Sequence, residues 1–278
     1  MSTRTSLVLG GGGITGIAWE IGILKALHDA GLKMTAADEI LGTSAGSVVG
    51  TLMSSHPIED LYVAQLEPPD PAVGGRFNVR AMVRALPVVG LPGGGHIERR
   101  RRLGGAAMRA LPFETEDRVA VIQERVEVED WPDTNLRITA MSAETGEIAV
   151  FDRSSGVNLF EAIAASCAVP FVWPAVRVGG HPYLDGGVRS TTNADLVEHT
   201  DVAVVIAPIP MNARRHFNIP AQLERAGVKQ SVVISPDATA RRAIGRNVLN
   251  PERQAAAARA GLVQGRLVAA RVRAIWPG

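Results

Sequence analysis

The sequence contains a single cysteine, Cys167, among its 278 residues. One thiol cannot form an internal disulfide, so the fold is not stabilised by a covalent cross-link. Nothing in the thiol content requires an oxidising compartment. We therefore expect the protein in a reducing cytoplasm.

Long apolar runs are also absent. The run from Leu7 to Leu9 ends in four glycines and is too short for the apolar region of a signal peptide or for a spanning helix. No other run approaches the length of a membrane span. We therefore expect any contact with a membrane to be peripheral.

The chain has almost no net charge. Its formal charge of +1 gives no global reason to expect a nucleic-acid partner. With 46% hydrophobic and 21% charged residues, the composition is typical of a soluble globular protein and not of a disordered chain. The length allows one substantial core and the chain contains no linker, so we expect one domain over residues 1–278.

Strand and helix patterns alternate at the start of the chain. Residues 5–9 predict a short buried strand, residues 10–13 a glycine turn, and the following residues a helix with Ile17, Ile21 and Leu24 on one face. Residues 39–42 predict a second strand, and a helix of small residues follows from Val48 to about Ser54. This order predicts an α/β fold with a central, mostly parallel sheet covered by helices on both faces.

The rest of the chain continues this pattern with one interruption. Two hairpins are predicted over 136–151 and 176–184, a helix over 159–168, and central strands over 201–207 and 231–234. The segment 68–112 is rich in proline and glycine, which predicts an insertion without regular structure, either a lid over a site or a surface loop.

The segment 250–278 is predicted to form a C-terminal helix, from Pro251 to Trp276. Arg259, Arg266 and Arg273 repeat every seven residues and so share one side of this helix. The simpler interpretation is that the helix packs on the sheet and exposes its arginines to water. Docking of a basic amphipathic helix on anionic lipid is the alternative.

Residues 42–46 form a G-x-S-x-G pattern around Ser44, between a predicted strand and a predicted helix. Such a turn exposes the serine in a strained position, and the small residues Gly42 and Gly46 let the backbone bend sharply. This predicts Ser44 as a nucleophile. The alternative is an ordinary turn in which Ser44 caps the helix.

A second glycine-rich segment runs from Gly10 to Gly16. Consecutive glycines between a strand and a helix can direct backbone N–H groups at an anion, which suits an oxyanion or a phosphate. A dinucleotide site would require an acidic residue at the end of the second strand. Asp38 and Glu39 instead open that strand, so the placement argues against a nucleotide.

These segments resemble the patatin-like phospholipases. The shared motifs are the glycine-rich loop, the G-x-S-x-G turn, an alanine-serine helix ending in prolines over 165–174, and Asp185-Gly186-Gly187. The resemblance covers residues 5–210. It implies a three-layer fold and a Ser44–Asp185 dyad that cleaves lipid acyl esters, phospholipid or lysophospholipid, with the backbone amides of Gly11, Gly12 and Gly13 as oxyanion hole. It implies no metal and no cofactor.

One residue departs from the family's pattern, and two alternatives to the dyad stay open. Thr15 stands where the family usually has a basic residue, which bears on head-group preference or on the stability of the loop. His199 or His216 would satisfy the chain order of a Ser-Asp-His triad. Alternatively, the chain is a catalytically silent binding or regulatory protein of the same fold.

Overall fold

The computed structural model describes residues 3–68, 80, 82–83, 87, 93–111, 115–210 and 218–277. Within them, one sheet of eight strands has the order β5-β6-β3-β2-β1-β7-β8, with β4 paired to β3 outside this order. The strands are β1 (Thr5–Leu9), β2 (Glu39–Thr43), β3 (Leu136–Ser142), β4 (Ile148–Phe151), β5 (Val176–Val178), β6 (His181–Asp185), β7 (Val202–Ile206) and β8 (Gln230–Ile234). The predicted mostly parallel sheet is confirmed, since β3, β2, β1, β7 and β8 pair in parallel.

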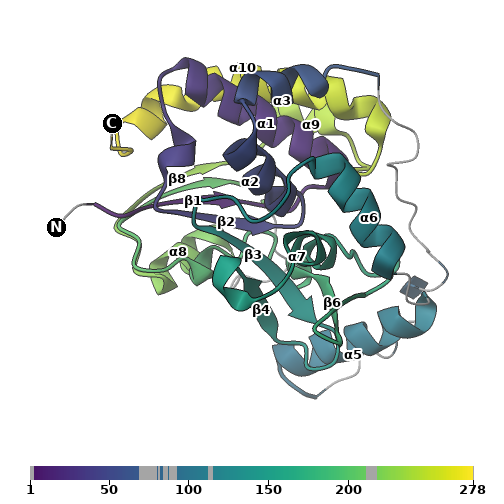
Figure 1. Cartoon of the computed structure of the whole chain (residues 1–278). Coiled ribbons are helices and arrows are strands. Elements are labelled where there is room, and N and C mark those ends of the chain that lie inside the picture. Colours follow the sequence, from purple (N-terminus) through teal and green to yellow (C-terminus); the bar gives the residue numbers. More distant parts are fainter. Residues whose placement is uncertain are drawn as a thin grey trace.

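Helices cover both faces of the sheet in three layers (Figure 1). The α-helices are α1 (Gly13–Asp29), α2 (Ala45–Ser55), α3 (Ile58–Ala64), α5 (His96–Ala110), α6 (Thr115–Val126), α7 (Leu159–Ser166), α8 (Ile219–Arg225), α9 (Ala238–Ile244) and α10 (Gln254–Arg273). Short 3-10 helices are η1 (Met34–Ala36), η3 (Arg153–Ser155), η4 (Gly186–Val188), η5 (Ala194–Leu196) and η7 (Pro251–Arg253).

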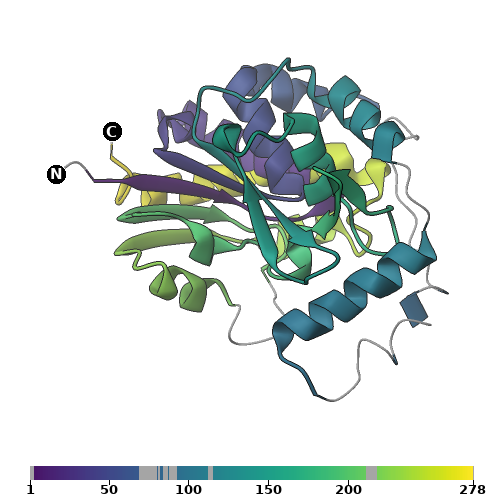
Figure 2. The same ribbon diagram turned by 60° about the horizontal axis from the view of Figure 1, so that its bottom comes forward.

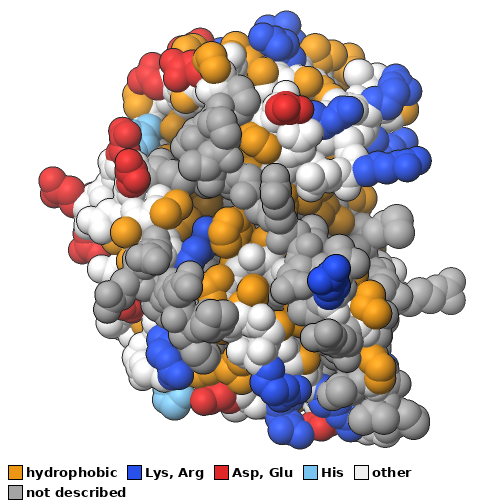
Figure 3. All heavy atoms as spheres, turned by 90° about the vertical axis from the view of Figure 1, so that its right-hand side faces the viewer, with side chains coloured by type: hydrophobic (Ala, Val, Ile, Leu, Met, Phe, Trp, Pro, Cys, Tyr) orange, Lys and Arg blue, Asp and Glu red, His pale blue; other side chains and the backbone are white. Residues whose placement is uncertain are grey.

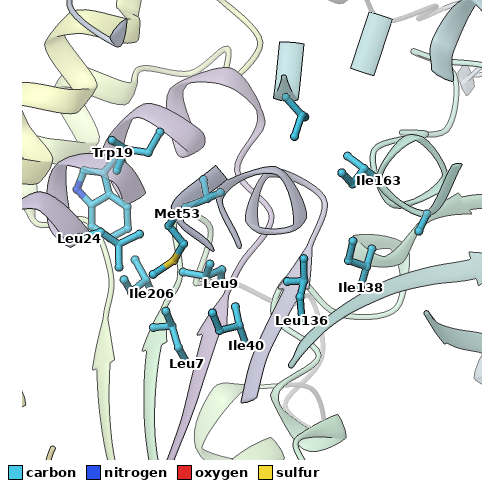
Figure 4. Packing of buried hydrophobic residues seen from close by; sticks show 14 of the residues in the cluster. Leu7, Leu9, Trp19, Leu24, Ile40, Met53, Leu136, Ile138, Ile163 and Ile206 are labelled. Carbon is cyan, nitrogen blue, oxygen red and sulfur yellow. The ribbon is translucent and has the colours of Figure 1, made fainter. Parts of the chain in front are cut away.

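The strands contribute side chains to two separate cores because successive residues of a strand point to opposite faces. Leu7 and Leu9 of β1 belong to the larger core, which packs against α1, α2 and α7. Figure 4 shows these leucines together with Trp19 of α1 and Met53 of α2. The intervening Val8 belongs to the smaller core, which α8 and η5 cover. Figure 2 shows the same sheet from below.

β3 brings the ends of two other strands together. β2 runs parallel to β3 and ends with Thr43 opposite Thr139. β6 runs antiparallel to β3 and ends with Asp185 opposite Ala140. Because β4 pairs with both Thr139 and Ala140 from the other side, β2 and β6 share one side of β3 and meet end to end. Ser44, the next residue after Thr43, is therefore placed beside Asp185.

Two expectations about elements were wrong. β8 is an edge strand, not a central one, and its first two residues, Gln230 and Ser231, are exposed. The apolar residues that follow in β8 pack against helices above and below the sheet. This kind of burial does not distinguish an edge strand from a central strand. The segment 68–112 includes the 15-residue helix α5, although most of the residues from 69 to 92 lie outside the described part. A role of this segment as a lid remains a prediction.

The C-terminal helix is confirmed as η7 followed by α10, which packs along α1. Glycines make this contact close: a Cβ at Gly22 would lie 2.2 Å from the carbonyl oxygen of Ala258, and one at Gly261 would lie 2.3 Å from that of Trp19. Among the helices of the described residues, none has the length and apolarity to cross a membrane.

Candidate active site

Ser44 occupies a strained turn between β2 and α2. Its backbone has φ 54° and ψ −118°, a conformation that non-glycine residues rarely adopt. The residue stands at the N-cap position of α2, but its side chain makes no capping hydrogen bond. The interpretation of Ser44 as an ordinary helix cap is therefore wrong.

The sharp turn depends on close approach of the backbone at Gly46. A Cβ at this position would lie 2.1 Å from the carbonyl oxygen of Leu9, so no larger residue fits. The N–H of Gly46 donates to the carbonyl of Gly10 at 3.0 Å, which ties the serine turn to the glycine-rich loop after β1.

Asp185 ends β6 and accepts two hydrogen bonds. The hydroxyl of Ser44 donates to its carboxylate, and the backbone N–H of Gly187 donates to Oδ1 at 2.7 Å. Burial raises the pKa of Asp185 to about 6, against the two hydrogen bonds, which lower it. The carboxylate is 5% exposed, and no ion pair to it is present among the described residues.

The glycine-rich loop lies beside this pair and supplies two available donors. The N–H of Gly11 donates to the carbonyl of Thr191 at 2.7 Å and is already engaged. For Gly12 and Gly13, the described residues offer no hydrogen-bond acceptor to the backbone N–H. Both residues stand at the start of α1, where the helix dipole favours negative charge.

Thr15 holds the loop in place without a basic side chain. It is fully buried, and its N–H and hydroxyl both donate to the carbonyl of Val248, at 3.1 and 3.3 Å. Gly13, with φ +60°, faces the same carbonyl, and a Cβ there would lie 2.8 Å from it. The loop is thus tied to the segment between α9 and α10. The effect of Thr15 on head-group preference remains a prediction.

A buried acid, Glu20, supports the base of the same loop. Its Oε1 accepts the N–H of Gly10 at 3.0 Å, while Oε2 has no hydrogen-bond partner in the described part of the chain. Burial raises the pKa of Glu20 well above its ordinary value, although the hydrogen bond from Gly10 lowers it. Burial thus favours the uncharged form of Glu20, which offers the loop an oxygen acceptor.

Two further residues hold the site together: Ser166, from the alanine-serine motif, and Asn193, which no motif singled out. Ser166, at the end of α7, accepts the N–H of Ser44 on its Oγ at 2.8 Å and so satisfies the strained backbone. Asn193 donates from Nδ2 to Thr43 Oγ1 and to the carbonyl of Gly186, both at 3.2 Å. These bonds connect the residue before Ser44 with the residue after Asp185.

The two side chains and the loop line one cavity of about 300 Å³. Its walls are mainly apolar, and they are formed by Gly11, Gly12, Gly13, Ser44, Val169, Pro170, Asp185, Gly187, Val188, Thr191, Ile209, Val248 and Leu249. Figure 3 shows the side of the molecule toward which the parallel strands run, where hydrophobic side chains lie between clusters of arginine and lysine.

Comparison with known proteins matches the family described as patatin-like phospholipase over residues 7–197. This match includes Ser44, Asp185 and both glycine-rich segments. The chain belongs to the patatin-like phospholipase family. No curated protein sequence matches the chain.

Solved structures similar to this patatin-like chain include proteins from Legionella pneumophila and Pseudomonas aeruginosa. VipD from Legionella pneumophila has 14% identity and a TM-score of 0.49, with 97% of this chain and 67% of that chain covered. The type III effector ExoU has 17% identity and a TM-score of 0.45, with 96% and 53% covered. The ExoU–SpcU complex of Pseudomonas aeruginosa has 17% identity and a TM-score of 0.42, with 95% of this chain and 52% of that chain covered. The chain thus spans about half the length of the ExoU chains.

The histidine alternative is not supported. His199 is exposed in the turn before β7, at the amino end of that strand, whereas Ser44 lies at the carboxyl end of the parallel sheet. A triad through His199 is therefore wrong. His216 lies outside the described residues.

The position of Asp38 argues against a dinucleotide at the glycine-rich loop. Asp38 accepts the N–H and the hydroxyl of Thr5, at 2.8 and 2.9 Å, at the amino end of the sheet. It is therefore remote from the glycine-rich loop. In the described part of the chain, no group of three or more His, Cys, Asp or Glu side chains could hold a metal ion.

Proposed function

We propose that this protein is a lipid acyl hydrolase in which Ser44 is the nucleophile and Asp185 the general base. The observation that carries this proposal is the hydrogen bond from the Ser44 hydroxyl to a buried carboxylate whose pKa is raised to about 6. Membership of the patatin-like phospholipase family supports a lipid ester as substrate.

The raised pKa suits the role of Asp185. A carboxylate with an ordinary pKa is a weak base, and its basicity increases when burial disfavours its charged form. At pH 7, a group with a pKa of about 6 is mostly ionised and can still accept a proton. No histidine is needed for this step.

The reaction proceeds in two halves. Asp185 takes the hydroxyl proton while Ser44 Oγ attacks the ester carbonyl, and the tetrahedral intermediate collapses to an acyl-enzyme as Asp185 protonates the leaving alcohol. Water then attacks the acyl-enzyme and gives a proton to Asp185. As the fatty acid leaves, Asp185 returns that proton to Ser44. Asp185 is thus ionised again at the end of the cycle.

The backbone N–H groups of Gly12 and Gly13 are the donors we propose for the oxyanion. Gly11 is not among them, because its N–H is engaged by Thr191. Donors fixed in a loop that is tied to Val248 and Glu20 need little reorganisation as charge develops on the oxygen.

The substrate we propose is a phospholipid or a lysophospholipid. The apolar side chains of Val169, Val188 and Leu249 line the cavity beside Ser44 and would contact an acyl chain. A neutral loop residue, Thr15, leaves the head group without a cation at that position. We expect acyl-chain contacts to contribute most of the binding energy.

Labelling with a fluorophosphonate probe, together with hydrolysis of fluorogenic esters of short and long acyl chains, tests this proposal. The wild-type protein should react at Ser44 and hydrolyse the esters, and Ser44→Ala should do neither. Ser47→Ala is a suitable control because Ser47 lies one turn further on α2 with its hydroxyl bonded to the Ser44 carbonyl.

Two results would reject the proposal in different ways. Labelling of another serine would mean that the nucleophile is misassigned. If the wild-type protein neither reacts nor hydrolyses any acyl ester, the chain is instead a silent binding or regulatory member of the family.

A further inference from the structure

The outer face of α10 exposes two large apolar side chains. Leu267 is 72% exposed and Val263 is 57% exposed, the highest exposures of large hydrophobic residues in the described chain. They are four residues apart and therefore adjacent on one side of the helix. Burying such a pair against another apolar phase would be favourable.

The inner face of α10 is already occupied by the fold. Ala258, Gly261 and Val272 are buried, and the glycines allow the backbone of α10 to approach α1 closely. Val272 therefore packs inside the protein. The apolar pair available for an outside partner is Val263 and Leu267.

Exposed arginines flank this apolar pair. Arg259, Arg266 and Arg271 are exposed, and none forms an ion pair with a described acidic residue. The 20 residues of α10 include no aspartate or glutamate. The face thus combines positive charge with exposed apolar side chains, although the whole chain has a net charge of only +1.

This combination fits an anionic bilayer better than a second copy of the chain. A helix with arginine beside exposed leucine and valine binds an interface through apolar burial and attraction to anionic head groups. Two copies that met through this face would bring their arginines together without a counter-charge.

The position of α10 relative to the cavity is consistent with such docking. The helix begins directly after η7, a few residues beyond Val248 and Leu249, which line the cavity beside Ser44. In Figure 1, α10 runs along the upper edge of the molecule from α9 to the C-terminus. A bilayer that contacts α10 would lie close to the segment that forms one wall of the cavity.

We propose that Arg259, Val263, Arg266, Leu267 and Arg271 form a docking surface for an anionic phospholipid bilayer. The relevance of this surface to substrate delivery rests on the proposed function, but the binding itself does not. Docking is therefore measured with the Ser44→Ala protein, in which no turnover takes place.

Co-sedimentation with vesicles of phosphatidylcholine, alone or mixed in equal parts with phosphatidylglycerol, tests the proposal. We expect binding to the mixed vesicles only, and weaker binding at high salt. Arg259→Glu combined with Arg266→Glu should weaken binding roughly tenfold or more. Leu267→Asp should also weaken it, because the side chain would no longer enter the interface.

Matched controls come from other exposed positions. Arg242→Glu combined with Arg246→Glu makes the same charge change near α9, and Val63→Asp replaces a residue of α3 that is 48% exposed. Both controls should bind as the unmodified protein does. Thermal unfolding of each variant verifies that it is folded.

Three results would overturn the proposal: no binding of the unmodified protein to mixed vesicles, equal loss in the Arg242/Arg246 control, or a dimer that Leu267→Asp dissociates. The last result would identify the face as an interface between copies. Fluorophosphonate labelling of the same variants with Ser44 intact reports separately on the active site. A failure of docking and a failure of the proposed chemistry are thus distinguishable.

Discussion

Buried carboxylates lie at both the amino and the carboxyl edge of the central sheet, where the parallel strands begin and end. Their hydrogen-bond partners differ. At the amino edge, Glu39 is 2% exposed and accepts hydrogen bonds from Ser6 Oγ at 2.8 Å and Arg137 Nη1 at 2.6 Å. At the carboxyl edge, Asp185 is 5% exposed and, among the described residues, accepts only from Ser44 and the N–H of Gly187.

The difference shows that a neighbouring cation decides how well a buried carboxylate is stabilised as an ion. A guanidinium beside Glu39 offsets the cost of burying its charge, and the resulting ion pair joins β2 to β3. Asp185 has no such cation among the described residues, so burial raises its pKa to about 6. A buried carboxylate without a cation is poorly stabilised as an ion, and that property makes it a useful base.

The largest expected effect is the loss of activity in Asp185→Asn. The amide keeps the shape of the carboxylate but cannot take the proton of Ser44, so kcat/KM for a fluorogenic ester should fall by a factor on the order of 10⁴. Steady-state kinetics measure this. A loss of less than tenfold would mean that another group is the base.

Glu39→Gln should lower stability by about 2 to 4 kcal/mol and leave kcat/KM within a factor of about three. The substitution removes the charge that Arg137 contacts in the sheet, and among the described residues the exposed Glu198 is the only other carboxylate paired with that arginine. Urea unfolding monitored by circular dichroism gives the stability. A large loss of activity in a folded variant would contradict a purely structural role of Glu39.

Asp185→Asn should have the opposite effect on stability. The pKa of Asp185 is about 6 in the folded state, against about 3.9 in an unfolded chain, so stability falls as the pH rises through this interval. Above pH 6 the full cost of the buried charge remains. The neutral amide should therefore raise stability at pH 7 by roughly 2 to 3 kcal/mol, with no gain at pH 4. Urea unfolding at both pH values would measure the difference.

The last prediction is the pH profile of the wild-type protein. Because Asp185 has to be ionised to accept a proton, kcat/KM should decline about tenfold per pH unit below the pKa of about 6. Stopped assays with a soluble ester between pH 4 and 8 measure the profile. A midpoint near 4 would show that burial does not raise the basicity of the reacting group.

Local patterns predicted much of the fold and the chemical groups of the site. The G-x-S-x-G pattern assigned Gly46 to the serine turn, and the structure supplies the reason, since a larger residue there would clash with Leu9. The position of β8 and the helix α5 could not be predicted. The strand order depends on which helices cover each face, and the arginines of α5 lie in a segment otherwise dominated by proline and glycine.

The sequence by itself determined a strained serine turn, a glycine-rich loop and an aspartate before two glycines, because each depends on the conformations of a few neighbouring residues. Only the tertiary structure decided that Ser44 meets Asp185, that Thr191 engages Gly11, and that Ser166 holds the backbone of Ser44. These contacts join residues more than 100 positions apart through the register of β3 and the packing of α7, and no local pattern specifies such distances.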